Sequence, residues 1–273
     1  MKKLFGKEYI QKEFTKINMI LKEKVNLYML GGGAMSFQKL KDATKDVDVV
    51  LTDKKAFNSL SDILHKSGYT DVMVKGPYER MNPSRVLENS DGFRFDMFIK
   101  QVCNGLLLSK AIIDRSTKII SFENVDIFTV APEDVFIFKS ITSRERDRED
   151  MNTLFHHGLD FDVIRKEILW QSKHSKNRAW LAFFYVGLEE IKVMFSLDIP
   201  YFDDFYELAC DEVLQHNILL LLEEKPRTIN DIVKKIGEDK NWIMRNIKRM
   251  IRKGLVVLDE DTVRLSGKNM GDK

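Results

Sequence analysis

Residues 25–51, VNLYMLGGGAMSFQKLKDATKDVDVVL, decide the fold that this chain is expected to adopt. Residues 25–30 are mostly apolar and predict a buried strand that leads directly into three consecutive glycines. A short helix over residues 34–40 should follow, and residues 45–51 predict a second strand. A strand that runs through glycines into a helix exposes backbone N–H groups to which phosphate oxygens bind. The stretch therefore predicts a phosphate-binding turn between two elements of a sheet, and the alternative is a tight turn from strand to helix without a ligand.

The rest of the chain predicts further strands first and then helices. Before residue 131 the apolar spacing predicts helices over 7–24 and 54–67, strands over 70–75 and 93–99, and a hairpin of residues 118–122 with 125–130. Pro132 suits the first turn of a helix, and residues 132–222 show helical spacing almost throughout. The expected fold class is therefore α+β, with a mixed sheet followed by a helical region.

The last sixty residues predict a separate module. Three helices are expected over residues 211–224, 230–236 and 241–253, followed by a hairpin of residues 255–258 and 262–265. Three helices and a hairpin in this order are typical of a winged helix, a helix-turn-helix variant. We therefore expect domains over residues 1–131, 132–210 and 211–273.

Composition excludes several classes of protein. The chain has 273 residues and a formal net charge of +2, so its overall charge indicates no partner. Two cysteines cannot form a disulfide framework or a four-cysteine zinc site. The apolar run at residues 218–222 is much shorter than the ~20 residues of a membrane span. These features predict a soluble, cytoplasmic protein.

The glycines also suggest a competing hypothesis. A Walker phosphate loop is absent, whereas Gly31 and Gly33 nearly match the dinucleotide fingerprint GxGxxG. Ser36 stands where the third glycine belongs, and Asp53 is placed where a ribose-binding acid is expected. An oxidoreductase that binds a nicotinamide cofactor is therefore one alternative.

Paired carboxylates on the second strand favour another chemistry. Asp46 and Asp48 are two residues apart in the predicted strand, so both point to one face, opposite the apolar residues between and after them. Neighbouring carboxylates suit a divalent cation such as Mg²⁺. Asp96 lies in another apolar strand, with Arg94 on the same face. Either Arg94 is simply its buried partner, or Asp96 completes a cluster of three carboxylates.

These residues resemble the nucleotidyltransferase superfamily with the DNA-polymerase-beta-type fold, and in particular its minimal prokaryotic members. The resemblance covers about residues 25–150 and rests on the glycines followed by Asp46-Val47-Asp48 and by a later acid. It implies that Asp46, Asp48 and Asp96 bind Mg²⁺ or Mn²⁺, and that Asp96 activates an acceptor hydroxyl. It further implies transfer of a nucleoside monophosphate from a triphosphate, with ATP as the expected donor, to a protein or RNA acceptor.

A triphosphate also requires cationic side chains. Residues 133–151, EDVFIFKSITSRERDREDM, supply Lys139 and three arginines, and Lys139 interrupts an otherwise apolar segment. The alternative interpretation is a helix whose charges pair with one another. The predicted nucleotide-binding residues are Gly31, Gly32, Gly33, Ser36 and Lys139.

A basic stripe marks the predicted third helix of the C-terminal module. Arg245, Lys248, Arg249 and Arg252 recur at spacings of three and four and so share one face. This face predicts binding to nucleic-acid phosphates, and the alternative is a role in packing, dimerisation or protein docking. The second hypothesis for the whole chain is therefore a DNA-binding regulator whose transferase domain is inactive or only senses nucleotide.

Overall fold

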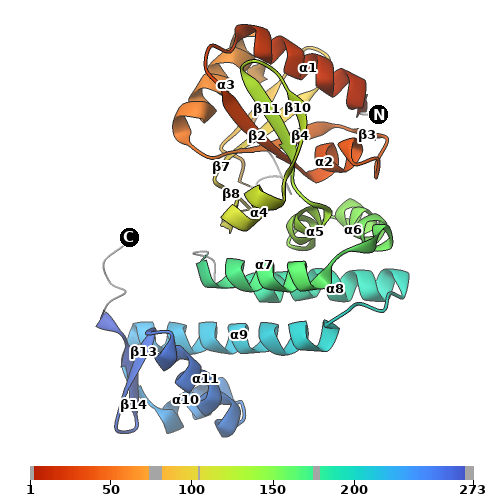
Figure 1. Cartoon of the computed structure of the whole chain (residues 1–273). Coiled ribbons are helices and arrows are strands. Elements are labelled where there is room, and N and C mark those ends of the chain that lie inside the picture. Colours follow the sequence, from red (N-terminus) through yellow and green to blue (C-terminus); the bar gives the residue numbers. More distant parts are fainter. Residues whose placement is uncertain (1–2, 74–81, 104, 175–178, 268–273) are drawn as a thin grey trace. The chain divides into compact units, whose positions relative to one another are not determined.

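The computed structural model describes residues 3–73, 82–103, 105–174 and 179–267 (Figure 1). Contacts within the chain divide it into two compact units. The first comprises Met1–Asn177 with Val186–Pro200, and the second comprises Arg178–Tyr185 with Tyr201–Lys273. The domain boundaries at residues 131 and 210 stay predictions.

A mixed seven-stranded sheet forms the centre of the first unit. Its strands β11 and β2 are parallel, as are β4 and β7, and the other neighbours are antiparallel. The mixed sheet and the α+β class are thereby confirmed. In spatial order the strands are β10 (Thr117–Ser121), β11 (Val125–Thr129), β2 (Val25–Leu30), β4 (Asp46–Leu51), β7 (Arg94–Ile99), β6 (Arg85–Glu88) and β5 (Thr70–Asp71).

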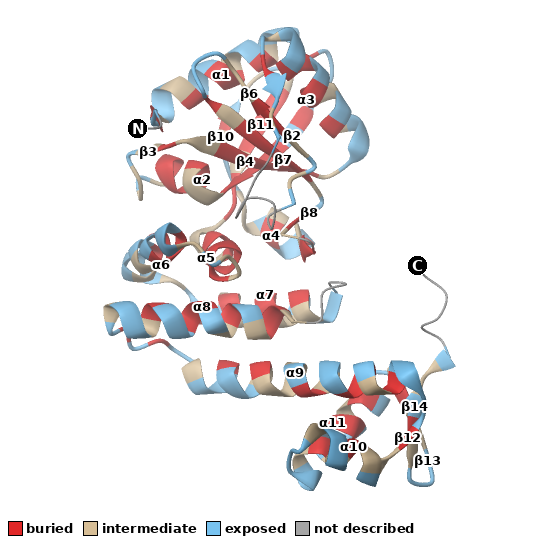
Figure 2. Cartoon of the chain, turned by 180° about the vertical axis from the view of Figure 1, so that it is seen from behind, coloured by how far each residue is buried: buried red, intermediate tan, exposed pale blue. Residues whose placement is uncertain are grey.

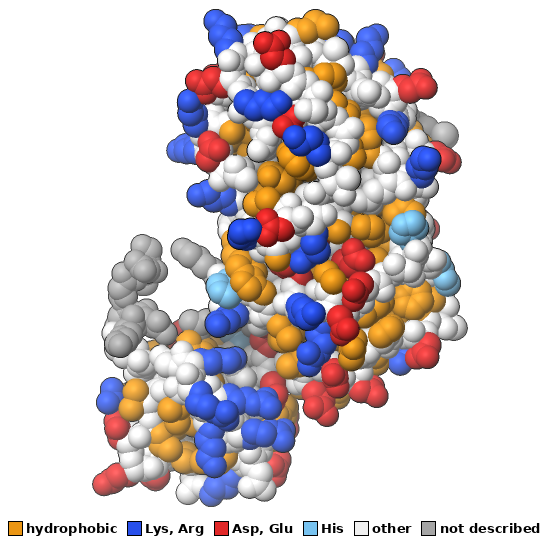
Figure 3. Space-filling model, in the orientation of Figure 1, with side chains coloured by type: hydrophobic (Ala, Val, Ile, Leu, Met, Phe, Trp, Pro, Cys, Tyr) orange, Lys and Arg blue, Asp and Glu red, His pale blue; other side chains and the backbone are white. Residues whose placement is uncertain are grey.

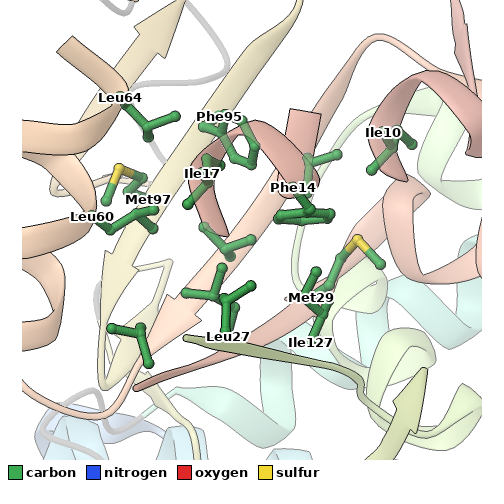
Figure 4. Close-up of a cluster of buried hydrophobic side chains, with 14 of the residues drawn as sticks. Ile10, Phe14, Ile17, Leu27, Met29, Leu60, Leu64, Phe95, Met97 and Ile127 are labelled. Carbon is green, nitrogen blue, oxygen red and sulfur yellow. The ribbon is translucent and has the colours of Figure 1, made fainter. Parts of the chain in front are cut away.

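One face of this sheet is covered by α1 (Lys7–Ile20) and α3 (Lys54–Lys66). Their apolar stripes and alternate strand residues form one buried cluster, shown in Figure 4 and as the red core of Figure 2. Val47, Val49 and Leu51 of β4 belong to this cluster. Because strand side chains alternate, Asp46 and Asp48 must point to the opposite face.

Several boundaries differ from those that the sequence predicts. Helix α2 (Gly31–Phe37) begins at the first glycine rather than near residue 34, and α1 ends at Ile20. Of the strand predicted over 70–75, β5 covers only Thr70–Asp71, and residues 74 and 75 lie outside the described residues. Strand β6 and helix α4 (Lys110–Arg115) were not predicted, nor were the two-residue strands β1 (Phe5–Gly6), β3 (Ala43–Thr44), β8 (Gln101–Val102) and β9 (Leu106–Leu107). Segments this short show no periodicity.

Helices α5 (Pro132–Ser140), α6 (Glu145–Gly158), α7 (Phe161–His174) and α8 (Trp180–Phe195) follow the sheet. Helix α5 begins at Pro132, as predicted. The buried Arg148 of α6 donates to the carbonyl oxygens of Lys139 (2.9 Å) and Thr142 (2.5 Å) and forms an ion pair with Glu190 of α8 (2.5 Å). Arg148 thereby adds side-chain donors to carbonyl groups at the end of α5, where the regular hydrogen bonds of the helix stop.

The second unit contains the predicted C-terminal elements in the predicted order. Its long helix α9 (Phe202–Glu224) begins at Phe202 rather than near residue 211. Strands β12 (Arg227–Thr228), β14 (Thr262–Leu265) and β13 (Val256–Asp259) form a sheet, and α9, α10 (Ile229–Ile236) and α11 (Lys240–Arg252) pack into its core. The winged-helix class stays a prediction. In the described part of the chain, no helix is both long and apolar enough to cross a membrane.

Gly187 of α8 is predicted to be indispensable for the contact between α8 and the end of α5. A Cβ atom there would lie 2.3 Å from the backbone oxygen of Ser140, a clash that no side-chain rotation relieves. Although alanine favours a helix, we expect Gly187→Ala to lower the free energy of unfolding by about 1–3 kcal/mol. Chemical denaturation measures the change. Gly267→Ala, where nothing lies within 4 Å, should be nearly neutral; equal stabilities for the two variants would contradict the packing argument.

Candidate active site

The three predicted carboxylates lie together on the open face of the sheet. Strands β4 and β7 are parallel neighbours, and in their register Asp46 is opposite Arg94 while Asp48 is opposite Asp96. Residues directly opposite each other on adjacent strands point to the same face. Asp96 therefore lies beside Asp48, on the face away from α1 and α3. This is the arrangement that the second interpretation of Asp96 requires.

Arg94 joins two of these carboxylates. Its Nη2 atom lies 2.9 Å from Oδ2 of Asp46, and its Nε atom lies 2.7 Å from Oδ1 of Asp96. Asp96 therefore has a cationic partner, as the first interpretation holds, and it also lies beside Asp48. The part of Asp96 in a metal-binding cluster stays a prediction.

The ion pairs of Arg94 are with Asp46 and Asp96 and do not include Asp48. Its side chain is only 7% exposed and has no hydrogen bond or ion pair within the described residues. Burial raises the pKa of Asp48 well above its ordinary value, the charges of Asp46 and Asp96 raise it further, and Arg144 and Lys139 oppose them. Burial also raises the pKa of Asp96, to about 7, against the effect of Arg94. A positive charge near Asp48 would relieve both effects.

The residues present fit a divalent cation by their chemistry. As they stand, no three His, Cys, Asp or Glu side chains of the described segments are arranged to hold a metal ion. Carboxylate oxygens are nevertheless the ligands that Mg²⁺ prefers, and Asp48 is a buried carboxylate without a partner in those segments. Asp46 and Asp48, with Asp96 beside them, are the residues that would hold the ion.

The glycines bring the backbone against this cluster. Gly31 has a φ of +62°, and a Cβ atom there would lie 2.3 Å from Oδ2 of Asp48. A Cβ atom on Gly32 would lie 2.7 Å from Oγ1 of Thr44. With Gly33 they form the first turn of α2 rather than a separate loop before it. The absence of side chains therefore permits the first turn of α2 to contact the carboxylates.

The other two predicted nucleotide-binding residues are both buried. Ser36 lies on α2, and its hydroxyl has no hydrogen-bond partner among the residues described. Lys139 of α5 is 5% exposed, and its Nζ atom lies 2.8 Å from Asp147 and 2.6 Å from Asp150. Burial lowers the pKa of Lys139, but these two carboxylates outweigh burial and raise it. Lys139 is therefore a charged group near the cluster, held by α6.

Sequence reasoning did not single out Asp150 or Lys41, which the structure places at the same site. Nζ of Lys41 lies 2.5 Å from Oδ1 of Asp150, although the two residues are far apart in the chain. No local periodicity connects a loop after α2 with a helix more than a hundred residues later, so the sequence carried no signal for this pair.

The dinucleotide-binding alternative is contradicted by the topology. The βαβ unit that binds dinucleotides requires two parallel strands, whereas β2 and β4 are antiparallel neighbours. Asp53, the proposed ribose-binding acid, instead caps α3 by accepting a hydrogen bond from the backbone N–H of Ala56 (2.8 Å). The oxidoreductase hypothesis is therefore wrong.

Three of the four basic residues predicted on α11 are exposed. Arg245, Lys248 and Arg252 are accessible, and Figure 3 shows Lys and Arg side chains gathered on the C-terminal part of the chain. Arg249 instead forms an ion pair with Asp211 of α9, which also accepts hydrogen bonds from Trp242 and Asn246. Arg249 thus contributes to packing within the second unit.

A carboxylate cluster on adjacent strands beside a glycine turn is the arrangement expected of a nucleotidyltransferase. The family model described as "nucleotidyltransferase of unknown function (DUF6036)" matches residues 9–192, and the chain belongs to this family. The match includes the sheet, the carboxylates and helices α5 to α7, and it ends within α8. A comparison with curated proteins gave no match.

Replacing Asp48 by Asn should stabilise the protein in the absence of a divalent cation. Folding raises the pKa of the Asp48 carboxyl. Its charge therefore destabilises the folded protein as the pH rises from the pKa of the unfolded chain through the pKa of the folded state. Asp48→Asn removes this charge, so the melting temperature of the variant should exceed that of the wild type at pH 8. The difference should shrink towards pH 5.

Asp126→Asn provides a control of opposite sign. Although burial opposes them, hydrogen bonds from Lys118, Ser121 and Lys24 lower the pKa of Asp126, so removal of its charge should lower the melting temperature at pH 8. Thermal denaturation between pH 5 and pH 8 in EDTA measures both variants. Destabilisation by Asp48→Asn across this whole range would contradict the electrostatic description of the site.

Proposed function

We propose that the chain transfers a nucleoside monophosphate from a nucleoside triphosphate to a hydroxyl group, in a reaction that requires Mg²⁺ or Mn²⁺. The observation that carries this proposal is the position of Asp48 beside Asp96, on parallel strands and against Gly31. Membership of the nucleotidyltransferase family supports the class of reaction. The acceptor is a protein or an RNA.

Each group has a defined part in this reaction. Asp46 and Asp48, with Asp96, hold the divalent cation, which neutralises charge on the phosphates when bound. Asp96 accepts the proton of the acceptor hydroxyl. The hydroxyl oxygen forms a bond to the α-phosphorus, and the bond from the α-phosphorus to the bridging oxygen breaks, which releases pyrophosphate. Gly31, Gly32, Gly33, Ser36 and Lys139 bind the triphosphate.

Transfer is tested with ATP, GTP, CTP and UTP, each labelled at the α-phosphate and incubated with the protein, Mg²⁺ and a cell lysate. Label from the α-position should appear in protein or RNA, whereas label from the γ-position should not. Asp46→Ala and Asp48→Ala should each lower the product by roughly 100-fold or more, because charge stabilisation at the phosphates is lost.

Asp62→Ala on the exposed surface of α3 is the matched control and should leave the product unchanged. EDTA should abolish transfer, and added Mn²⁺ should restore it. Labelling that persists at full rate in both active-site variants would exclude this proposal and favour the regulator that only senses nucleotide.

We further propose that the C-terminal unit is a winged helix that binds nucleic acid. The exposed Arg245, Lys248 and Arg252 on one face of α11 support this function. A helix that presents several cations on one face contacts the phosphates of a duplex regardless of base sequence. Arg249, the fourth residue of the predicted stripe, also forms an ion pair with Asp211.

Charge reversal on α11 should weaken binding to a labelled DNA duplex in a salt-dependent manner. In the double variant Arg245→Glu/Lys248→Glu, the slope of log affinity against log salt should fall by about two, since each lost phosphate contact contributes about one. Fluorescence anisotropy over a salt series measures the slope. The variant Lys54→Glu/Lys66→Glu on α3 carries the same change in charge and should keep the wild-type slope. Equal loss in both variants would indicate attraction by net charge alone.

A further inference from the structure

Two lysines from distant parts of the chain share one buried carboxylate beside the glycine turn. Nζ of Lys41 lies 2.5 Å from Oδ1 of Asp150, and Nζ of Lys139 lies 2.6 Å from Oδ2 of the same carboxylate on α6. The side chain of Lys41 is 17% exposed and that of Asp150 is 10% exposed. Two ammonium groups are therefore held close together in a largely desolvated position.

Cations outnumber carboxylates in this cluster. Asp147 pairs with Lys139 and with Arg144, and the charges of Lys139 and Arg146 both act on Lys41. Lys41, Lys139 and Arg144 thus form ion pairs with two buried carboxylates, Asp147 and Asp150. Burial lowers the pKa of Lys41, and Asp150 opposes this effect. Positive charge in excess at a partly buried position is costly unless an anion joins it.

The turn formed by Gly31 and Gly32 lies between this cluster and the acidic one. A Cβ atom on Gly31 would meet the carboxylate of Asp48, whereas one on Gly32 would lie 4.0 Å from Cδ of Lys41. Asp48, which has no ion pair among the described residues, and the side chain of Lys41 thus approach consecutive residues of the turn. A polyphosphate with a bound divalent cation carries the complementary charges in one molecule.

We propose that Lys41 is a phosphate-binding residue, which with Lys139 holds the polyphosphate of the nucleotide on the side of the glycine turn opposite Asp48. The inference rests on the proposed function, and it adds a residue to that site. An ammonium group has three N–H donors, and Asp150 occupies one of those of Lys41. Asp150 is then a positioning residue that fixes both lysines relative to the turn.

Binding of inorganic tripolyphosphate with Mg²⁺ tests this assignment without reference to a base or an acceptor. Isothermal titration calorimetry should show binding to the wild type, and Lys41→Met should raise the dissociation constant roughly 10-fold or more, because a charge-assisted hydrogen bond is lost. Lys41→Arg keeps the charge and should lose less than Lys41→Met. Lys66→Met, on the exposed surface of α3, is the matched control and should bind as the wild type does.

A second measurement uses the wild-type chain, so it does not depend on the folding of a variant. Acetic anhydride modifies lysine amines, and mass spectrometry gives the extent of modification at each residue. Tripolyphosphate with Mg²⁺ should protect Lys41 at least ~3-fold, since a bound phosphate occupies the N–H donors of its amine. The exposed Lys66 should react equally with and without the ligand.

The outcomes separate this assignment from the function on which it rests. If the wild type binds neither tripolyphosphate nor any of the four nucleoside triphosphates, the proposed transfer and the role of Lys41 fail together. Only the role of Lys41 is overturned if three results occur together: the wild type binds these ligands, Lys41→Met binds them equally well, and Lys41 is not protected. Weaker binding by Lys41→Met with protection of Lys41 supports the assignment.

Discussion

The pairing of β4 with β7 places Asp48 in a buried position beside two other carboxylates, and the rest of the site is arranged around this charge. Arg94 compensates Asp46 and Asp96 but leaves Asp48 without a cation among the described residues. Gly31 approaches Asp48 because it has no side chain. Such a cluster opposes folding at neutral pH, which is a common property of sites that bind a charged ligand.

Because side chains alternate in the sheet, one face carries the apolar residues that stabilise the fold and the other carries the carboxylates of the candidate site. Val47, Val49 and Leu51 of β4 pack under α1 and α3 and supply apolar burial, whereas Asp46 and Asp48 lie on the opposite face. Helices α5 and α6 then bring lysines and arginines to the glycine turn, and Arg148 fixes the end of α5. Asp46, Asp48 and Asp96 thus come from the sheet and Lys139 from the helices, while the ion pair of Lys41 with Asp150 joins the segment after α2 to α6.

Elements with a strong period were predictable, and elements without one were not. Strands β2, β4 and β7, helix α3 and the start of α5 at Pro132 follow directly from apolar spacing and from proline. Helix α2 starts earlier than predicted because its glycines are packed against β4 instead of forming a loop. The basic stripe of α11 was visible as a pattern, but only the packing of α9 against α11 shows that Arg249 is engaged by Asp211.

The sequence by itself determined the α+β class, the shared face of Asp46 and Asp48, and the glycine turn before them, since each depends on neighbours along the chain. Only the tertiary structure decided that Asp96 lies in register with Asp48, that β2 and β4 are antiparallel, and that Lys41 shares Asp150 with Lys139. Strand order and ion pairs between distant segments depend on which surfaces pack together, and the spacing of residues along the chain does not show which surfaces these are.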